Sequence, residues 1–298
     1  MDFTLFVGDY AYSSWSLRGW LLLDAFGIPF TLRHAHMKTP AFEDLRAEMA
    51  PSRLVPTLAV SDGTRAPVMV WETLAIAETL HEYYNQVGLW PKGESARPTA
   101  RAVAAEMHAG FTALRSACPM NMRRAYEGFD VSDDVRADLN RLSAVWAHAR
   151  ARATEDGPFL FGAFSAVDAF FAPVASRIAT YGLAMPDADM EYVAAVLGHP
   201  SVRRWRAMGQ ADGHLQSQYE FDYPARPNPH DPVVTGLAVT DGTAENSFCP
   251  FSGLDVSADG LVAVDGRVIG FCNPFCRDKV AADPMAWPDA AALLSRSE

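Results

Sequence analysis

Long apolar runs are missing from this chain of 298 residues. No stretch reaches the roughly 18 apolar residues that cross a bilayer, so we expect no membrane association. The first ten residues, MDFTLFVGDY, lack the basic and apolar segments of a secretory signal peptide. Cysteine is also scarce, with four in the chain and none before Cys118, which argues against a disulfide scaffold. We therefore expect the protein in the reducing cytoplasm.

Runs of basic residues are equally absent. The formal net charge is -11, whereas nucleic-acid-binding proteins normally present a basic surface, so we expect no nucleic-acid partner. The hydrophobic fraction of 49% and the charged fraction of 20% are typical of a globular protein. A chain of this length can bury the cores of two or three domains.

The first 88 residues predict an α/β domain. Short apolar segments typical of strands lie at 3–7, 29–36, 55–60 and 67–71. The Asp62-Gly63 pair between the last two indicates a hairpin. Helical patterns lie at 16–28 and 72–84. The resulting order, βαβ followed by a hairpin and a helix, predicts a thioredoxin-like domain over 1–88.

Downstream of Pro91 the apolar residues recur at helical spacing. The pattern predicts an all-α domain over 92–221, with helices at 97–118, 133–153 and 165–182 and one or two more within 187–208. Four prolines in residues 222–232 indicate a linker, which we extend over 222–246. A small third domain, 247–298, contains three of the four cysteines.

The stretch YAYSSWSLR, residues 10–18, places three serines before the first helix. Ser13, Ser14 or Ser16 could each be the N-cap, which stabilises a helix by ~1 kcal/mol without any function. Alternatively, the loop and the helix N-terminus form an anion site, because free N–H groups and the helix dipole favour negative charge there. The local pattern supports both interpretations equally.

Two further stretches can be interpreted either structurally or functionally. Pro56 enters a strand, which suits an edge strand, or else Val55-Pro56 is a cis bond that leaves the Val55 backbone free to pair with a bound peptide. Glu72 and Thr73 begin a helix, where such residues are favoured as caps. They would also suit a zwitterionic amino-acid head, with Glu72 taking the ammonium and Thr73 the carboxylate.

Together these motifs make residues 1–220 resemble the cytosolic glutathione transferases. The resemblance rests on Ser-Ser-x-Ser-x-Arg at 13–18, Val-Pro-x-Leu at 55–58, Glu-Thr-x-Ala-Ile at 72–76, and a capping box at 165–168. The SSWSLR form is most similar to the zeta-like bacterial branch. Trp15 stands where zeta enzymes have cysteine, which argues against the zeta isomerase reaction.

The resemblance implies a homodimer that activates the thiol of glutathione, its co-substrate, for attack on an apolar electrophile. It assigns the catalytic hydroxyl to Ser13, with Ser14 as the competing candidate. Ser16 falls where the helix begins, so a structural role fits it better. The glutathione-binding residues it implies are Tyr12, Ser16, Val55, Pro56, Glu72 and Thr73. The electrophile pocket would include Trp15, His108, Phe111 and Arg115. From the helical pattern, Phe111 also fits core packing, and His108 and Arg115 also fit a solvated polar face.

The C-terminal domain resembles the small metal-binding modules of the YHS or TRASH type. Cys249-Pro250 is followed by a predicted hairpin with Asp265-Gly266 at its turn, and then by Cys272 and Cys276. Such a module would hold zinc through the three cysteines, although a structural zinc takes four ligands. The alternative is a small strap with buried thiols.

Two other functions remain open from the sequence. One is a glutathione-binding scaffold of the same fold with little catalysis. The other is a metal-binding or metal-sensing protein that acts through the C-terminal cysteines, with the transferase fold as a platform for dimerisation.

Overall fold

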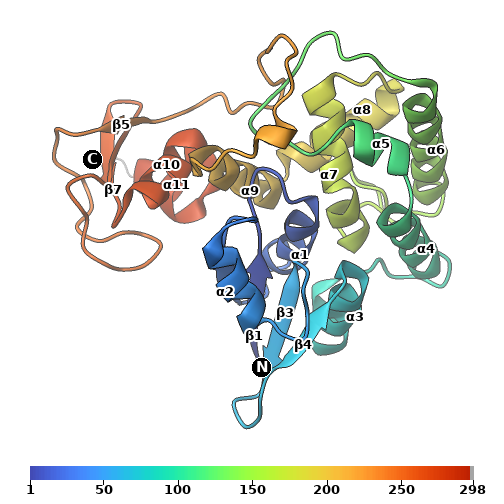
Figure 1. The fold of residues 1–298 in the computed structure, drawn as a ribbon, viewed down its shortest axis with the longest axis horizontal. Helices are drawn as coiled ribbons and strands as arrows, with labels where there is room; N and C mark the ends of the chain where they lie inside the picture. Colours follow the sequence, from blue (N-terminus) through green and yellow to red (C-terminus); the bar gives the residue numbers. More distant parts are fainter. Residues whose placement is uncertain (296–298) are drawn as a thin grey trace.

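A four-stranded mixed sheet forms the centre of the N-terminal domain in the computed structural model, which describes residues 1–295 (Figure 1). Its strands are β1 (Asp2–Val7), β2 (Thr31–His34), β3 (Thr57–Ser61) and β4 (Val68–Trp71), in the order β2-β1-β3-β4. β1 pairs parallel with β2 and antiparallel with β3, and β3 pairs antiparallel with β4. The order confirms the predicted thioredoxin-like fold and the predicted hairpin.

Helices cover both faces of this sheet. α1 (Ser14–Asp24) and α3 (Thr73–Tyr83) contact each other on the face where Leu5 and Leu58 join the main core. The opposite face is closed by α2 (Pro40–Glu48), which forms a separate small core with β1 and β3. The sequence analysis missed α2, because only two of its nine residues are buried and its apolar pattern is correspondingly short.

The second domain is helical, as predicted. Its helices are α4 (Ala96–Ala109), α5 (Thr112–Ala117), α6 (Asp133–Arg150), α7 (Ala166–Tyr181), α8 (Asp187–Gly198) and α9 (Pro200–Ala211). Every residue of α7 is buried, and α1 of the first domain packs directly against it. Short 3-10 turns occur at η1 (Asn85–Val87) and η2 (Ser217–Tyr219). The two domains therefore share one core at the α1–α7 contact.

The single helix predicted for 97–118 is wrong, because the structure has two helices there. α4 ends at Gly110, where a Cβ atom would lie 2.8 Å from the carbonyl oxygen of Glu106. Phe111 follows with φ 57°, a conformation that a non-glycine residue seldom adopts and that ends a regular helix. The break turns the Phe111 ring into the core, where it is 6% exposed.

The C-terminal part contains an antiparallel sheet of β5 (Leu237–Val239), β6 (Leu261–Val264) and β7 (Arg267–Gly270). Asp265 and Gly266 both have positive φ in the β6–β7 turn, in the manner of the predicted hairpin. β5 comes from within the segment 222–246, so the expected linker contributes a strand to this sheet.

Three short helical segments follow, namely α10 (Pro274–Ala282), η3 (Pro284–Ala286) and α11 (Pro288–Leu294). α10 packs against α9, and Figure 1 shows the C-terminal part on the far side of α9 from α4 and α6. Arg203 of α9 donates two hydrogen bonds, of 2.9 and 2.6 Å, to Asp283 of the C-terminal part. Among residues 1–295, no helix combines the length and apolarity needed to cross a membrane.

Candidate functional site

A cavity of about 240 Å³ lies where α1, α3 and α4 meet the loop before β3. Its lining consists of Trp15, Leu54, Val55, Pro56, Glu72, Thr73 and His108. All of these except Leu54 are residues that the sequence analysis assigned to glutathione or electrophile binding. A larger cavity of about 560 Å³ between α4 and α6 contains none of the predicted site residues, so we take the smaller cavity as the candidate site.

The three serines of the first loop have distinct places in the structure. Ser13 is the N-cap of α1, and its Oγ accepts from the backbone N–H of Ser16 at 3.2 Å. The Oγ atoms of Ser13 and Ser16 share a hydrogen bond of 2.8 Å, and Ser16 Oγ also accepts from Gly8 N–H at 3.0 Å. Ser16 is fully buried, whereas Ser14, the first residue of the helix, is partly exposed. The hydroxyl that caps the helix is thus that of Ser13.

Positive charge is concentrated behind Trp15. The Arg18 and Arg115 guanidinium groups lie 4.4 and 5.0 Å from the centroid of the Trp15 ring. Arg18 is 1% exposed, its Nε donates to Phe170 O at 3.0 Å, and its two terminal nitrogens have no hydrogen-bond partner among the described residues. Because this charge is poorly compensated, it favours an anionic group at the nearby N-terminus of α1.

Glu72, Thr73 and His108 form a connected group beside Trp15, whose ring meets that of His108 edge to face at 4.9 Å. His108 Nε2 lies 3.2 Å from Glu72 Oε2, and its Nδ1 lies 3.3 Å from Thr73 Oγ1. Burial lowers the pKa of His108 below its usual value, Glu72 opposes this effect, and Arg18 and Arg115 add to it. Glu72 has φ 68°, a strained conformation of the kind that is concentrated at functional sites.

Some predicted residues lie outside the cavity lining, among them the three serines of the first loop. The Tyr12 hydroxyl donates to Glu220 at 3.0 Å, and burial raises the pKa of Tyr12 to about 12. Phe111 lies in the core, as the alternative interpretation predicted. Arg115 donates to the carbonyl oxygens of His108 and Gly110, each at 3.3 Å. The Val55–Pro56 bond is cis, as the functional interpretation of that stretch required.

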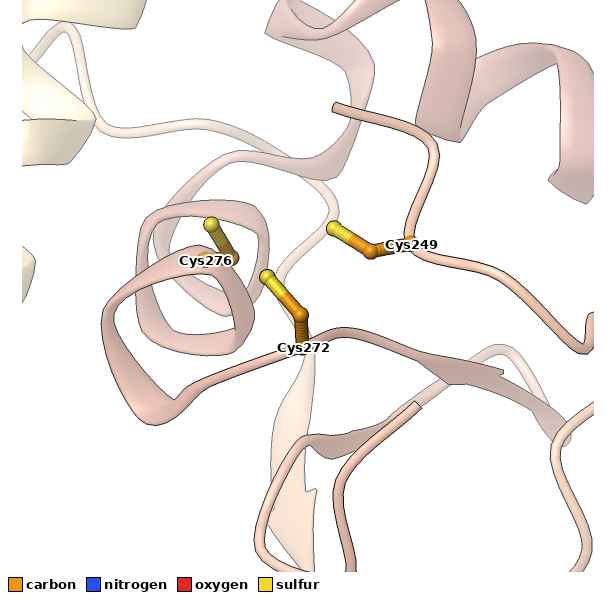
Figure 2. Close-up of side chains that lie close together, drawn as sticks. All are labelled: Cys249, Cys272 and Cys276. Atoms are coloured by element: carbon orange, nitrogen blue, oxygen red, sulfur yellow. The ribbon is translucent and has the colours of Figure 1, made fainter. Parts of the chain in front are cut away.

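A second candidate site is formed by the cysteines of the C-terminal part. Figure 2 shows Cys249, Cys272 and Cys276 close together, and their sulfur atoms all lie within 4.8 Å of one another. Cys249 comes from a loop, Cys272 follows β7, and Cys276 lies in the first turn of α10. The sequence analysis predicted this set, while Cys118 is buried in the core of the helical domain.

Hydrogen bonds around the cysteines favour negative charge on sulfur. Ser252 Oγ and Asn273 Nδ2 each donate to Cys272 Sγ at 3.2 Å. Burial disfavours the Cys249 thiolate, but hydrogen bonds from the backbone of Cys272, Phe251 and Ser252 outweigh it and lower the pKa of Cys249 to about 7. Burial raises the pKa of Cys276 to about 11. Three close sulfurs, of which those of Cys249 and Cys272 accept hydrogen bonds, fit a thiolate-bound metal ion.

Comparison with known proteins identifies the first domain. The family model "Glutathione S-transferase, N-terminal domain" matches residues 12–82, which include the serine loop, the cis Val55–Pro56 bond and the Glu72–Thr73 pair. The chain has the glutathione transferase fold. No curated protein matches its sequence.

Several solved structures share this glutathione transferase fold. One is a glutathione transferase homolog from Burkholderia with bound glutathione, which is 22% identical and has a TM-score of 0.53. The match covers 71% of this chain and 100% of the homolog. Glutathione transferase Omega 3C from Trametes versicolor is 19% identical, with a TM-score of 0.51 and coverage of 69% and 88%. A homolog from Lodderomyces elongisporus, with two glutathione molecules per subunit, is 12% identical, with a TM-score of 0.53 and coverage of 69% and 98%.

Proposed function

We propose that this protein is a cytoplasmic, homodimeric glutathione transferase that uses the Ser13 hydroxyl to stabilise the glutathione thiolate. The observation that carries the proposal is the cavity that brings Trp15, the cis Val55–Pro56 segment, Glu72 and Thr73 together beside the N-terminus of α1. Two of the structures with the same fold contain glutathione. Trp15 and the adjoining apolar lining would receive an apolar electrophile.

The chemistry requires that glutathione lose its thiol proton. A free thiol with a pKa near 8.5 is mostly protonated at neutral pH. The positive end of the α1 dipole and the buried Arg18 charge both favour the thiolate. The thiolate then forms a carbon–sulfur bond with the electrophile, and either a leaving group departs with its electron pair or the adduct takes up a proton.

Ser16 allows Ser13 to donate to the thiolate. In the free protein Ser13 donates to Ser16 Oγ over 2.8 Å. A hydroxyl can rotate, so the same hydrogen bond can be made with Ser16 as donor. Ser13 Oγ would then accept from both the hydroxyl and the N–H of Ser16, and its own proton would be free for the sulfur of glutathione. Accepting these bonds also strengthens Ser13 as a donor.

The Glu72–His108 pair would prepare the site for the γ-glutamyl ammonium. Since burial lowers the pKa of His108, its imidazole is neutral at pH 7 and does not neutralise Glu72. The ammonium group can therefore donate a charge-assisted hydrogen bond to the Glu72 carboxylate. Thr73 and the N-terminus of α3 are placed to bind the neighbouring carboxylate of glutathione.

Replacing Glu72 tests this placement. We expect Glu72→Gln to raise the KM for glutathione by about 10-fold or more with little change in kcat, because a hydrogen bond to a charged group contributes about 1.5–3 kcal/mol. Steady-state conjugation of an aryl halide measures both constants. Glu78→Gln is the matched control, since Glu78 lies on the same helix and pairs with Arg101 at 2.7 Å on the surface. An unchanged KM in Glu72→Gln would contradict the placement.

The same assay separates the transferase from a non-catalytic scaffold. The proposed transferase conjugates a generic aryl halide at a rate above the spontaneous reaction with glutathione. Glutathione binding measured by calorimetry, together with no conjugation of several aryl and alkyl halides, would instead support the scaffold.

We further propose that Cys249, Cys272 and Cys276 bind a structural zinc ion in a YHS-type C-terminal domain. When bound, the ion would link the loop at Cys249 to β7 and α10. A domain with so small a core gains stability from such a link. If metal sensing were the main function, removing these thiols would abolish metal responses without affecting conjugation.

Metal analysis of the purified full-length protein tests the zinc proposal. We expect the triple variant Cys249→Ser, Cys272→Ser, Cys276→Ser to lose one equivalent of zinc and to unfold at a lower temperature. Cys118→Ser is the control, because Cys118 is buried in the other domain and burial raises its pKa to about 12. An unchanged zinc content in the triple variant would rule out the site.

A further inference from the structure

A second cluster of metal-binding side chains lies away from the cavity and the cysteines. Asp9 follows β1, His36 follows β2, and Asp212 and His214 follow α9. The ligand atoms of Asp9, His36 and His214 all lie within 4.8 Å of one another, as do those of His34, His36 and Asp212. Asp9 and His214 are 205 positions apart in the chain, and nothing proposed above uses these residues.

The spacing of the first group fits a coordinated ion. Asp9 Oδ1 lies 3.3 Å from His36 Nδ1 and 3.8 Å from His214 Nε2. Two ligand atoms bound at 2.0–2.1 Å to a tetrahedral ion such as zinc lie about 3.4 Å apart. These two separations are close to the one that a single small metal ion imposes. The rings of His36 and His214 are stacked with centroids 4.3 Å apart, and His214 Nε2 lies 3.3 Å from Gln216 Nε2, so binding would rotate one ring and replace that contact.

The hydrogen bonding of Asp9 leaves one oxygen for a ligand. Asp9 is 1% exposed, and its Oδ2 accepts from Met37 N–H at 3.1 Å and from Gln216 Nε2 at 3.3 Å. Its Oδ1 has no hydrogen-bond partner among the described residues, and neither has His36 Nδ1. A buried carboxylate oxygen without a partner is costly, and a cation between the two atoms would satisfy both.

The far side of His36 supports the same arrangement. His36 Nε2 lies 3.4 Å from Asp212 Oδ1. Ligating histidines usually give their other ring N–H to a carboxylate, which sets the tautomer and directs the free lone pair at the metal. With Nε2–H facing Asp212, the lone pair of Nδ1 faces Asp9. The alternative group with His34, whose Nε2 also has no hydrogen-bond partner among the described residues, would use Nε2 of His36 and would leave the carboxylate oxygen Asp9 Oδ1 unsatisfied.

We propose that Asp9, His36 and His214 bind one divalent transition-metal ion of the zinc type. Two imidazoles and one carboxylate form a donor set that suits zinc and its first-row neighbours. The side chains of His36 and His214 are 32% and 30% exposed, so the ion reaches solvent and completes its coordination with water.

The ion would join the serine loop to the segment after α9. The carbonyl oxygen of Asp9 accepts from Ser13 N–H at 3.0 Å, so Asp9 is one hydrogen bond from the proposed catalytic serine. His214 belongs to the segment that leads from the helical domain toward the C-terminal part. The site therefore acts as a clamp between two domains, and metal binding should raise the thermal unfolding temperature.

The test uses the full-length triple variant Cys249→Ser, Cys272→Ser, Cys276→Ser, which lacks the three C-terminal thiols. The variant is stripped of metal, and separate samples are titrated with Zn²⁺ and with Co²⁺. We expect one equivalent of either ion to bind, the Co²⁺ form without thiolate charge-transfer absorption, and the unfolding temperature to rise. Adding His214→Gln or Asp9→Asn should weaken binding by at least about 100-fold. His148→Gln, which changes an exposed histidine of α6, is the control.

No metal binding in this background, or unchanged binding in both His214→Gln and Asp9→Asn, would overturn the proposal and leave His36 as an ion-pair partner of two aspartates. Loss of binding in His34→Gln with retention in Asp9→Asn would also overturn it, because the other group would then be the ligand set. If the thiol-free chain does not fold, the wild type should bind two equivalents of Zn²⁺. The variant His214→Gln should then bind one equivalent of Zn²⁺, and its Co²⁺ form should keep the thiolate absorption unchanged. Binding of two equivalents by His214→Gln would refute the proposed site.

Discussion

Replacing Ser13 by alanine is expected to lower kcat/KM for glutathione conjugation by about 100-fold or more. Removing one preorganised donor to an anionic oxygen in other enzymes costs about 100- to 1,000-fold. We expect a similar loss here, because the Ser13 hydroxyl is placed at the N-terminus of α1 and is held by Ser16. The pKa of the bound glutathione thiol, followed by thiolate absorbance, should rise in parallel toward the value in water.

Two further variants separate catalysis from helix capping. Ser13→Ala also removes an N-cap, which costs ~1 kcal/mol of stability. Ser13→Asp keeps the cap but cannot donate to a thiolate, so it should retain stability and still lose activity. Ser14→Ala is the matched control and should change kcat/KM by no more than a few fold. The reverse result, with Ser14→Ala inactive and Ser13→Ala active, would transfer the catalytic role to Ser14.

Replacing Asp168 by alanine is expected to lower the free energy of unfolding by about 4 kcal/mol. Asp168 is fully buried and accepts four hydrogen bonds. The donors are the N–H groups of Leu160 (3.3 Å) and Ser165 (2.8 Å), the Ser165 hydroxyl (2.9 Å) and the Tyr192 hydroxyl (3.0 Å). Alanine would leave all four donors buried without an acceptor, which explains why the loss should exceed that of an ordinary cap.

Urea unfolding at pH 8 measures this loss. Burial raises the pKa of Asp168 to about 6, although all four donors favour the charged form, so the carboxylate is ionised at pH 8. Tyr192→Phe removes one of the four donors and should cost only about 1 kcal/mol. A loss below about 1.5 kcal/mol in Asp168→Ala would show that the loop at Leu160 and Ser165 finds other partners.

Local features of the site followed from short sequence patterns. The Ser165–Asp168 capping box and the Asp265-Gly266 hairpin turn depend on neighbouring residues, and both occur in the structure, whereas the sequence left the cis Val55–Pro56 bond as one of two alternatives. Backbone hydrogen bonding and allowed φ angles decide such features over a few residues. The order of the four strands, and the places of α1 and α3 among them, followed from apolar spacing.

Features that depend on weak or interrupted patterns were not foreseen. α2 buries too few residues to show a clear period, and Gly110 gave no warning that Phe111 would adopt a positive φ and end α4. The pairing of His108 with Glu72 and Thr73 was also not foreseen, because it requires α4 to pack against the start of α3.

The division between the two kinds of information is clear at the two candidate metal sites. Cys249, Cys272 and Cys276 lie within 28 residues in a recognisable motif, so the sequence alone was sufficient to predict that their sulfur atoms converge. Asp9, His36 and His214 have no common motif, and only the packing of α9 beside the ends of β1 and β2 brings them together. Turns and local hydrogen bonds are determined by residues that are neighbours along the chain. A site built from distant segments exists only when a shared core holds those segments in place.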